Sequence, residues 1–160
     1  MVLPPKSEFV NALHTALREE LAAVERMAAM ARDEATSSET KAEGKYDTRA
    51  TEASYLARGQ AERIAELRRL TAWYELSDRG VPVGEPVVQL GALVVVESET
   101  SEVLFVAPVG GTRAEVAGIL VRAVSLSSPL GRAIRDLEEG DGVEVVTPRG
   151  VLDIEVVSIG

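Results

Sequence analysis

The apolar residues in the first half of the chain recur at intervals of three and four positions, as on one face of an α-helix. The first run follows Pro4 and Pro5, where Ser7 is suited to cap a helix. Its apolar positions are Phe9, Leu13, Leu17, Leu21, Val24, Met27 and Ala31. The second run ends before Gly80 and Pro82, and its positions are Ala50, Ala53, Ala57, Gln60, Ile64, Leu67, Thr71 and Tyr74. The pattern predicts two helices of about 25 to 30 residues, hence roughly 40 Å long.

The residues between these two runs are polar and include few large apolar side chains. A turn in this segment would place the helices antiparallel, so that each buries the apolar stripe of the other. Two such stripes are too narrow to enclose a globular core, so we expect the hairpin to project. The prediction is an antiparallel helical hairpin, or coiled coil, over residues 1–80 with an acidic tip near 33–47.

From residue 81 the pattern changes to short β-branched runs separated by Gly and Pro, which is typical of an antiparallel sheet. These runs are residues 87–91, 92–97, 103–108, 118–124, 143–147 and 151–159. One short helix interrupts them, because Ser128 can cap it, Pro129 suits its first position and Gly140 can end it. Residues 81–160 are therefore predicted to form a β-rich domain, and the whole chain belongs to the α+β class.

Composition narrows the chemistry that this chain can perform. A net charge of -9 opposes broad binding to nucleic-acid phosphates and favours a protein partner. The lack of cysteine excludes disulfides, thiolate metal sites and a cysteine nucleophile. The sole histidine, His14, is expected at the surface, and Trp73 and Tyr74 are expected to pack where the helices meet the β domain. Because no signal peptide or long apolar run is present, we expect a cytoplasmic location and no membrane contact.

Three linked motifs resemble the C-terminal domain of the bacterial Gre-type transcript cleavage factors, the GreA/GreB family. They are Ser-Pro-Leu-Gly-Arg-Ala-Ile at 128–134, Gly-Asp-Gly-Val-Glu-Val at 140–145 and Thr-Pro-Arg-Gly at 147–150. The resemblance implies an FKBP-like β domain that docks on the rim of the RNA polymerase secondary channel, with Ser128, Pro129 and Arg132 in partner binding. It also implies that the hairpin enters the channel, and that the chain helps the polymerase to cleave backtracked RNA without being an enzyme itself.

The tip carries Asp33, Glu34, Glu39, Glu43 and Asp47. The resemblance makes Glu39 and Glu43 the candidate catalytic carboxylates, which would share Mg²⁺ with the polymerase, since Mg²⁺ prefers oxygen ligands and another molecule can complete its shell. No cofactor is expected on the chain alone. The family spaces its two acids three residues apart, whereas Glu39 and Glu43 are four apart and no asparagine accompanies them. If Tyr46 is instead aligned with the tyrosine of the family's tip, Ala42 occupies the position of the second acid. A third interpretation is that these charges only solvate a turn.

Several other interpretations remain open. Arg58 and Arg63 could meet the polymerase channel or the RNA 3′ end, or could simply pair with Glu62 and Glu66 along the helix. A Gre-like protein could also occupy the channel without promoting cleavage, as a regulator or inhibitor of transcription. An FKBP-like fold raises the remote alternative of a prolyl isomerase, although residues 81–160 contain one aromatic residue, Phe105. We expect a monomer, with a homodimer joined through the hairpin as the alternative.

Overall fold

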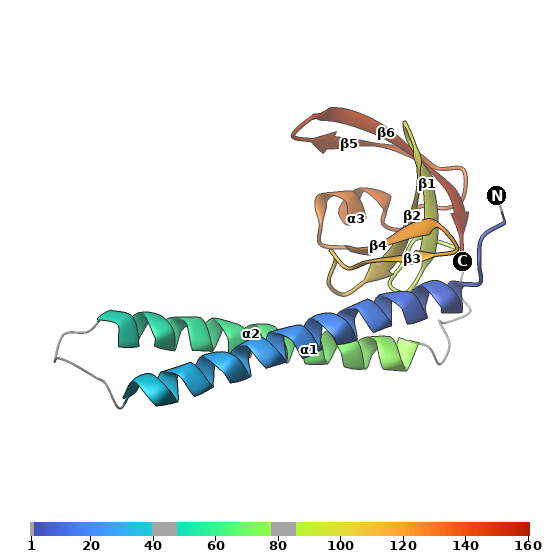
Figure 1. Cartoon of the computed structure of the whole chain (residues 1–160). Helices are drawn as coiled ribbons and strands as arrows, with labels where there is room; N and C mark the ends of the chain where they lie inside the picture. Colours follow the sequence, from blue (N-terminus) through green and yellow to red (C-terminus); the bar gives the residue numbers. More distant parts are fainter. Residues whose placement is uncertain (1, 40–47, 78–85) are drawn as a thin grey trace. The chain divides into compact units, whose positions relative to one another are not determined.

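The computed structural model describes residues 2–39, 48–77 and 86–160 (Figure 1). Two long helices, α1 (Lys6–Glu39) and α2 (Thr48–Ser77), precede six strands and one short helix. The chain divides into two compact units, one of residues 17–72 and the other of residues 1–16 with 73–160. The boundary expected between residues 80 and 81 lies outside the described residues. Within the described ranges, no helix is long and apolar enough to cross a membrane.

In the unit of residues 17–72, α1 and α2 run antiparallel, as the sequence predicts (Figure 1). Leu17, Ile64 and Leu67 are buried between them. Farther along the pair, the facing residues are mostly alanines, and Ala28, Ala31, Ala53 and Ala57 line a narrow hollow. Met27, expected in the apolar stripe, is instead 62% exposed, and the neighbouring Ala28 is the buried residue.

The second unit contains a six-stranded sheet in the order β3-β4-β2-β1-β6-β5. Its strands are β1 (Leu93–Glu97), β2 (Ser101–Ala107), β3 (Arg113–Val116), β4 (Ile119–Ser125), β5 (Gly142–Thr147) and β6 (Gly150–Ile159). The sheet is mixed, which corrects the expectation of a fully antiparallel one: β2 pairs with β4 in parallel, while the other pairs are antiparallel. The difference arises because β3 takes the edge, so that β4 returns beside β2 in the same direction.

Residues 87–91 do not form the strand that their β-branched pattern predicts. Only a single bridge joins Val87 to Glu138, although Val88 is fully buried. Backbone hydrogen bonds tie Val88 to Asp136 and Leu137, where the chain leaves the short helix, and Gly91 turns with a positive φ of 87°. This segment therefore anchors a loop and contributes one side chain to the core.

The central strands of the sheet are buried on both faces. On one face, helix α3 (Pro129–Ile134) covers an aliphatic core that includes Val94, Leu104 and Ile134. On the other face, Phe105 is fully buried, with ring centroids 6.1 Å from Trp73 and 5.6 Å from Tyr74. These contacts confirm the expected packing of Trp73 and Tyr74 at the junction. The expectation for His14 is wrong: its side chain is 18% exposed and its ring stacks on Tyr74.

Candidate functional site

The first motif, residues 128–134, holds the start of α3 against the end of β4 through hydrogen bonds. The Ser128 hydroxyl accepts a hydrogen bond from the Gly131 amide (3.0 Å) and donates one to the Ser125 carbonyl (2.7 Å). Pro129 occupies the first turn, where a missing amide proton costs nothing. A Cβ atom at residue 131 would lie 1.9 Å from the Ser125 oxygen, so only glycine fits there. Ser128 thus caps and positions the helix, and its role in partner binding stays a prediction.

The second and third motifs form turns that support the β5–β6 pair. Gly140 has a φ of 90°, which favours glycine, and the Asp141 carboxylate accepts a hydrogen bond from the Glu138 amide (2.8 Å). At the tip of the pair, the Thr147 hydroxyl donates to the Gly150 carbonyl (2.8 Å), and Gly150 has a φ of 130°. The motifs that suggest a family are therefore residues that hold this fold in place.

The surface beside α3 joins exposed cations to apolar groups. Arg132 and Arg135 are exposed, and they border a shallow hollow of about 430 Å³ with Leu90, Pro108 and Leu126. Residues 81–160 carry 5 basic and 12 acidic side chains, a net of -7, so this pair of cations is a local exception. We call Leu90, Leu126, Pro129, Arg132 and Arg135 the α3 surface. Such a surface can bind a partner that offers carboxylates beside apolar side chains.

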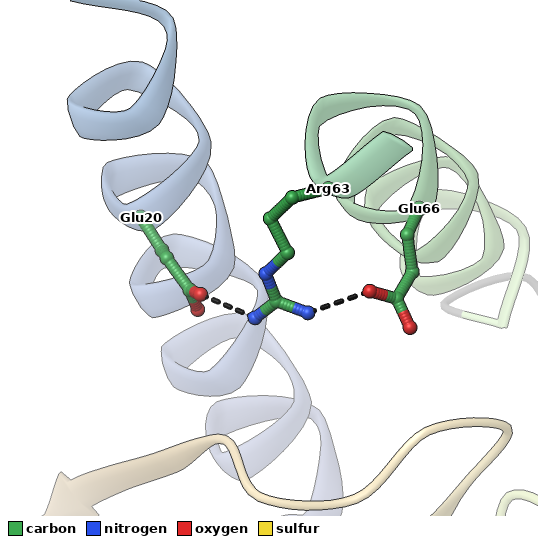
Figure 2. Close-up of polar contacts among 3 residues, drawn as sticks. All are labelled: Glu20, Arg63 and Glu66. Atoms are coloured by element: carbon green, nitrogen blue, oxygen red, sulfur yellow. Dashed lines mark hydrogen bonds and ion pairs between the residues drawn. The ribbon is translucent and has the colours of Figure 1, made fainter. Parts of the chain in front are cut away.

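The cations predicted on α2 differ in their surroundings. Arg63 donates to Glu20 on α1 and to Glu66 one turn away (2.7 Å), as Figure 2 shows. These bonds, the one from Glu20 first, raise the pKa of Arg63. The pairing expected with Glu66 is confirmed, and the bond to Glu20 ties the two helices together. Arg58 is exposed beside Thr51 and Tyr55 and has no ion pair within residues 2–39, 48–77 and 86–160.

The tip carboxylates fall at the limit of what the structure describes. Glu39 is the last residue of α1, and Glu43 lies outside the described residues. Asp33 and Glu34, six and five residues before Glu39 in α1, are exposed. Within the described residues, no group of three acidic or histidine side chains could hold a metal ion. Glu39, Glu43 and their shared Mg²⁺ therefore remain predictions.

Two features of the structure escaped sequence reasoning. The register of β3 and β4 places Arg113 directly opposite Arg122, which the strand pattern alone does not reveal. The burial of Phe105 against Trp73 and Tyr74 also bears on the isomerase alternative, because a fully buried ring has no exposed face for a proline to contact.

Comparison with known proteins supports the resemblance most directly in the β domain. Residues 83–160 match the family model described as the C-terminal part of the transcription elongation factor GreA/GreB. A GreA of Rickettsia felis is 32% identical over 97 residues, which are 61% of this chain and 58% of that protein. A GreA of Syntrophobacter fumaroxidans is 44% identical over 70 residues, 43% of each chain. The chain thus spans about three fifths of the length of the first of these relatives.

Two solved structures are also similar. Gfh1 of Thermus aquaticus is 20% identical, with 93% of this chain and 94% of that chain covered and a TM-score of 0.38. A GreA/GreB factor of Nitrosomonas europaea is 24% identical, with 49% and 64% covered and a TM-score of 0.36. At these scores the structural likeness carries no argument, so the assignment rests on the sequence matches. Residues 83–160 therefore match, over their whole length, the C-terminal domain of the GreA/GreB family of transcription elongation factors, and they contain the three motifs described above.

Proposed function

We propose that this chain is an accessory factor of bacterial RNA polymerase, which binds at the secondary channel and stimulates the polymerase's own cleavage of backtracked RNA. It acts as a monomer in the cytoplasm, where the polymerase works, and is not an enzyme by itself. The observation that carries the proposal is the match of residues 83–160 to the GreA/GreB C-terminal domain, because those residues contain all three motifs that hold the fold.

In this proposal the β domain binds the polymerase, and the hairpin extends into its secondary channel. The α3 surface offers the Arg132 and Arg135 guanidinium groups beside Leu90 and Leu126, a combination suited to an acidic and apolar protein rim. Two antiparallel helices of 34 and 30 residues are long enough for a deep insertion, since at about 1.5 Å per residue they span about 51 Å and about 45 Å. Arg58 is free of ion pairs among the described residues and could face the RNA 3′ end.

The tip would complete the reaction by bringing Glu39 and Glu43 to the polymerase active centre. A Mg²⁺ ion shared there would activate water and stabilise the displaced phosphate oxygen. The chain's own contribution is to hold carboxylates at the end of a narrow two-helix support. Pairs such as Arg63 with Glu20, and Arg68 with Glu25 (2.7 Å), keep those helices in register.

The decisive experiment incubates the purified chain with backtracked elongation complexes and Mg²⁺ and measures release of the 3′ RNA fragment. Release above the polymerase's intrinsic rate is expected, with a loss for Glu39→Ala and Glu43→Ala. The matched control is Glu52→Ala, an exposed acid on α2, which should leave release unchanged. If binding to core polymerase is retained but no variant or wild-type chain accelerates release, the cleavage role is wrong.

A second candidate is a factor that occupies the channel without promoting cleavage. The observation that favours it is the tip itself, where the two acids are four residues apart and no asparagine accompanies them. Entry into a channel needs only shape and charge, whereas cleavage needs placed carboxylates. This candidate predicts that the chain lowers the activity of a cleavage-competent GreA added to the same complexes. Failure to bind core polymerase at all would reject both candidates.

A further inference from the structure

A hollow on the sheet shares no lining residue with the hollow beside the α3 surface. It has a volume of about 570 Å³ and is bordered by β2, β3 and β4. Its lining combines Arg113, Arg122 and Glu102 with the apolar side chains of Ile119 and Leu120. Leu120 is 56% exposed, so an apolar surface is open to solvent beside the charged groups.

The two arginines are brought together by strand register. Arg113 on β3 lies directly opposite Arg122 on β4, and residues opposite each other in an antiparallel pair project from the same face. Like charges in this arrangement destabilise the pair. These are two of only five cations in residues 81–160, whose net charge is -7. The positive charge is therefore concentrated at a place where it costs stability.

Glu102 neutralises only part of that charge. Its carboxylate accepts from the Arg122 guanidinium at 2.8 Å, and both side chains are partly exposed. Arg113 is exposed and has no ion-pair partner in the described part of the chain. The other acid on this face, Glu115, lies opposite Leu120 and is not part of the lining. Two cations and one carboxylate line the hollow, and its remaining positive charge is carried by Arg113, which has Glu115 two residues away on the same face of β3.

We propose that this hollow binds a carboxylate side chain of a protein partner, held between Arg113 and Arg122, with an adjacent apolar side chain of that partner on Leu120. Guanidinium groups bind carboxylates with paired, directional hydrogen bonds, and two of them can share one carboxylate. A carboxylate brings a single negative charge, whereas a nucleic acid brings a row of phosphates that the surrounding charge of -7 repels. The proposal is independent of polymerase binding.

The test uses the peptide N-acetyl-Leu-Glu-Leu-amide as the probe, with the full chain labelled for NMR. Saturable shifts are expected at the side-chain N–H groups of Arg113 and Arg122, with a dissociation constant in the millimolar range. Arg113→Gln should weaken binding about tenfold, the usual loss for one charge-assisted hydrogen bond. Arg149→Gln, at the exposed β5–β6 turn, is the matched control and should bind normally.

Glu102→Gln has the opposite expected effect and separates a binding site from a structural ion pair. Because it removes the carboxylate that competes for Arg122, the peptide should bind up to about fivefold tighter. Weaker binding by this variant, with its fold intact by circular dichroism, would overturn the proposal. Equal binding of the uncharged peptide N-acetyl-Leu-Gln-Leu-amide, tighter binding of inorganic phosphate, or no saturable shift would overturn it as well.

Discussion

Replacing Gly131 by alanine should separate α3 from the sheet. The added Cβ would meet the Ser125 oxygen at 1.9 Å, the Ser125 carbonyl carbon at 2.7 Å and the Leu126 Cα at 2.8 Å. All three are backbone atoms, so no side-chain rotation can relieve the overlap. The helix must move by more than 1 Å, roughly, to restore ordinary van der Waals separation.

The expected loss follows from what that movement breaks. Overpacking of this kind costs about 1 to 3 kcal/mol. The bonds of Ser128 to Gly131 and to Ser125 are strained in addition, at about 1 kcal/mol each. We therefore expect Gly131→Ala to lower the free energy of unfolding of the β domain by about 3 to 5 kcal/mol.

Trp73 provides the assay, because it is the only tryptophan and it packs on Phe105 within the β unit. Urea unfolding followed by its fluorescence reports that unit. The matched control is Gly59→Ala in α2, where an added Cβ meets nothing within 4 Å. Circular dichroism at the helical band should show this control to be more stable by about 0.5 to 1 kcal/mol. Equal urea midpoints for Gly131→Ala and the wild type would refute the reasoning.

Three further outcomes are expected. Ala117 has a positive φ of 51° in the β3–β4 turn, so Ala117→Gly should stabilise the β domain by about 1 kcal/mol in urea unfolding, and a decrease would contradict the turn assignment. Arg63→Gln should lower the free energy of unfolding of the helix pair by no more than about 1 kcal/mol, since the Arg63 side chain is 44% exposed. If the variant and the wild type still differ by this amount at high salt, the loss does not have an ionic origin. Burial raises the pKa of the Tyr74 phenol above its ordinary 10.0, so the phenol ionises at lower pH in the unfolded chain than in the folded one. The contribution of Tyr74 to folding stability is therefore full below about pH 10 and declines as the pH rises above that value. Tyr74→Phe should flatten that alkaline decline, and an unchanged slope would show that another group is responsible.

Local patterns in the chain were sufficient for the helices, the short helix and most strands. The three-and-four spacing that ends at Tyr74 predicts α2, and Ser128 with Pro129 predicts the start of α3, because helix geometry and capping depend on neighbours in sequence. The motifs at 128–150 likewise indicate their family, since the turns they form require glycine or a capping hydroxyl at set positions. Trp73 and Tyr74 were predictable at the junction because they stand near the end of the helical repeat, before the β-rich segment begins.

Only the tertiary structure decided which strands lie side by side in the sheet and which side chains meet between the helices. Strand length and alternation do not specify which strand lies alongside, so the parallel pairing of β2 with β4 and the opposition of Arg113 and Arg122 required the folded sheet. The partial burial of His14 and the bond from Arg63 to Glu20 depend on the second helix in the same way. A sequence determines which residues can take a local conformation, whereas contacts between distant segments depend on how the whole chain balances burial against exposure.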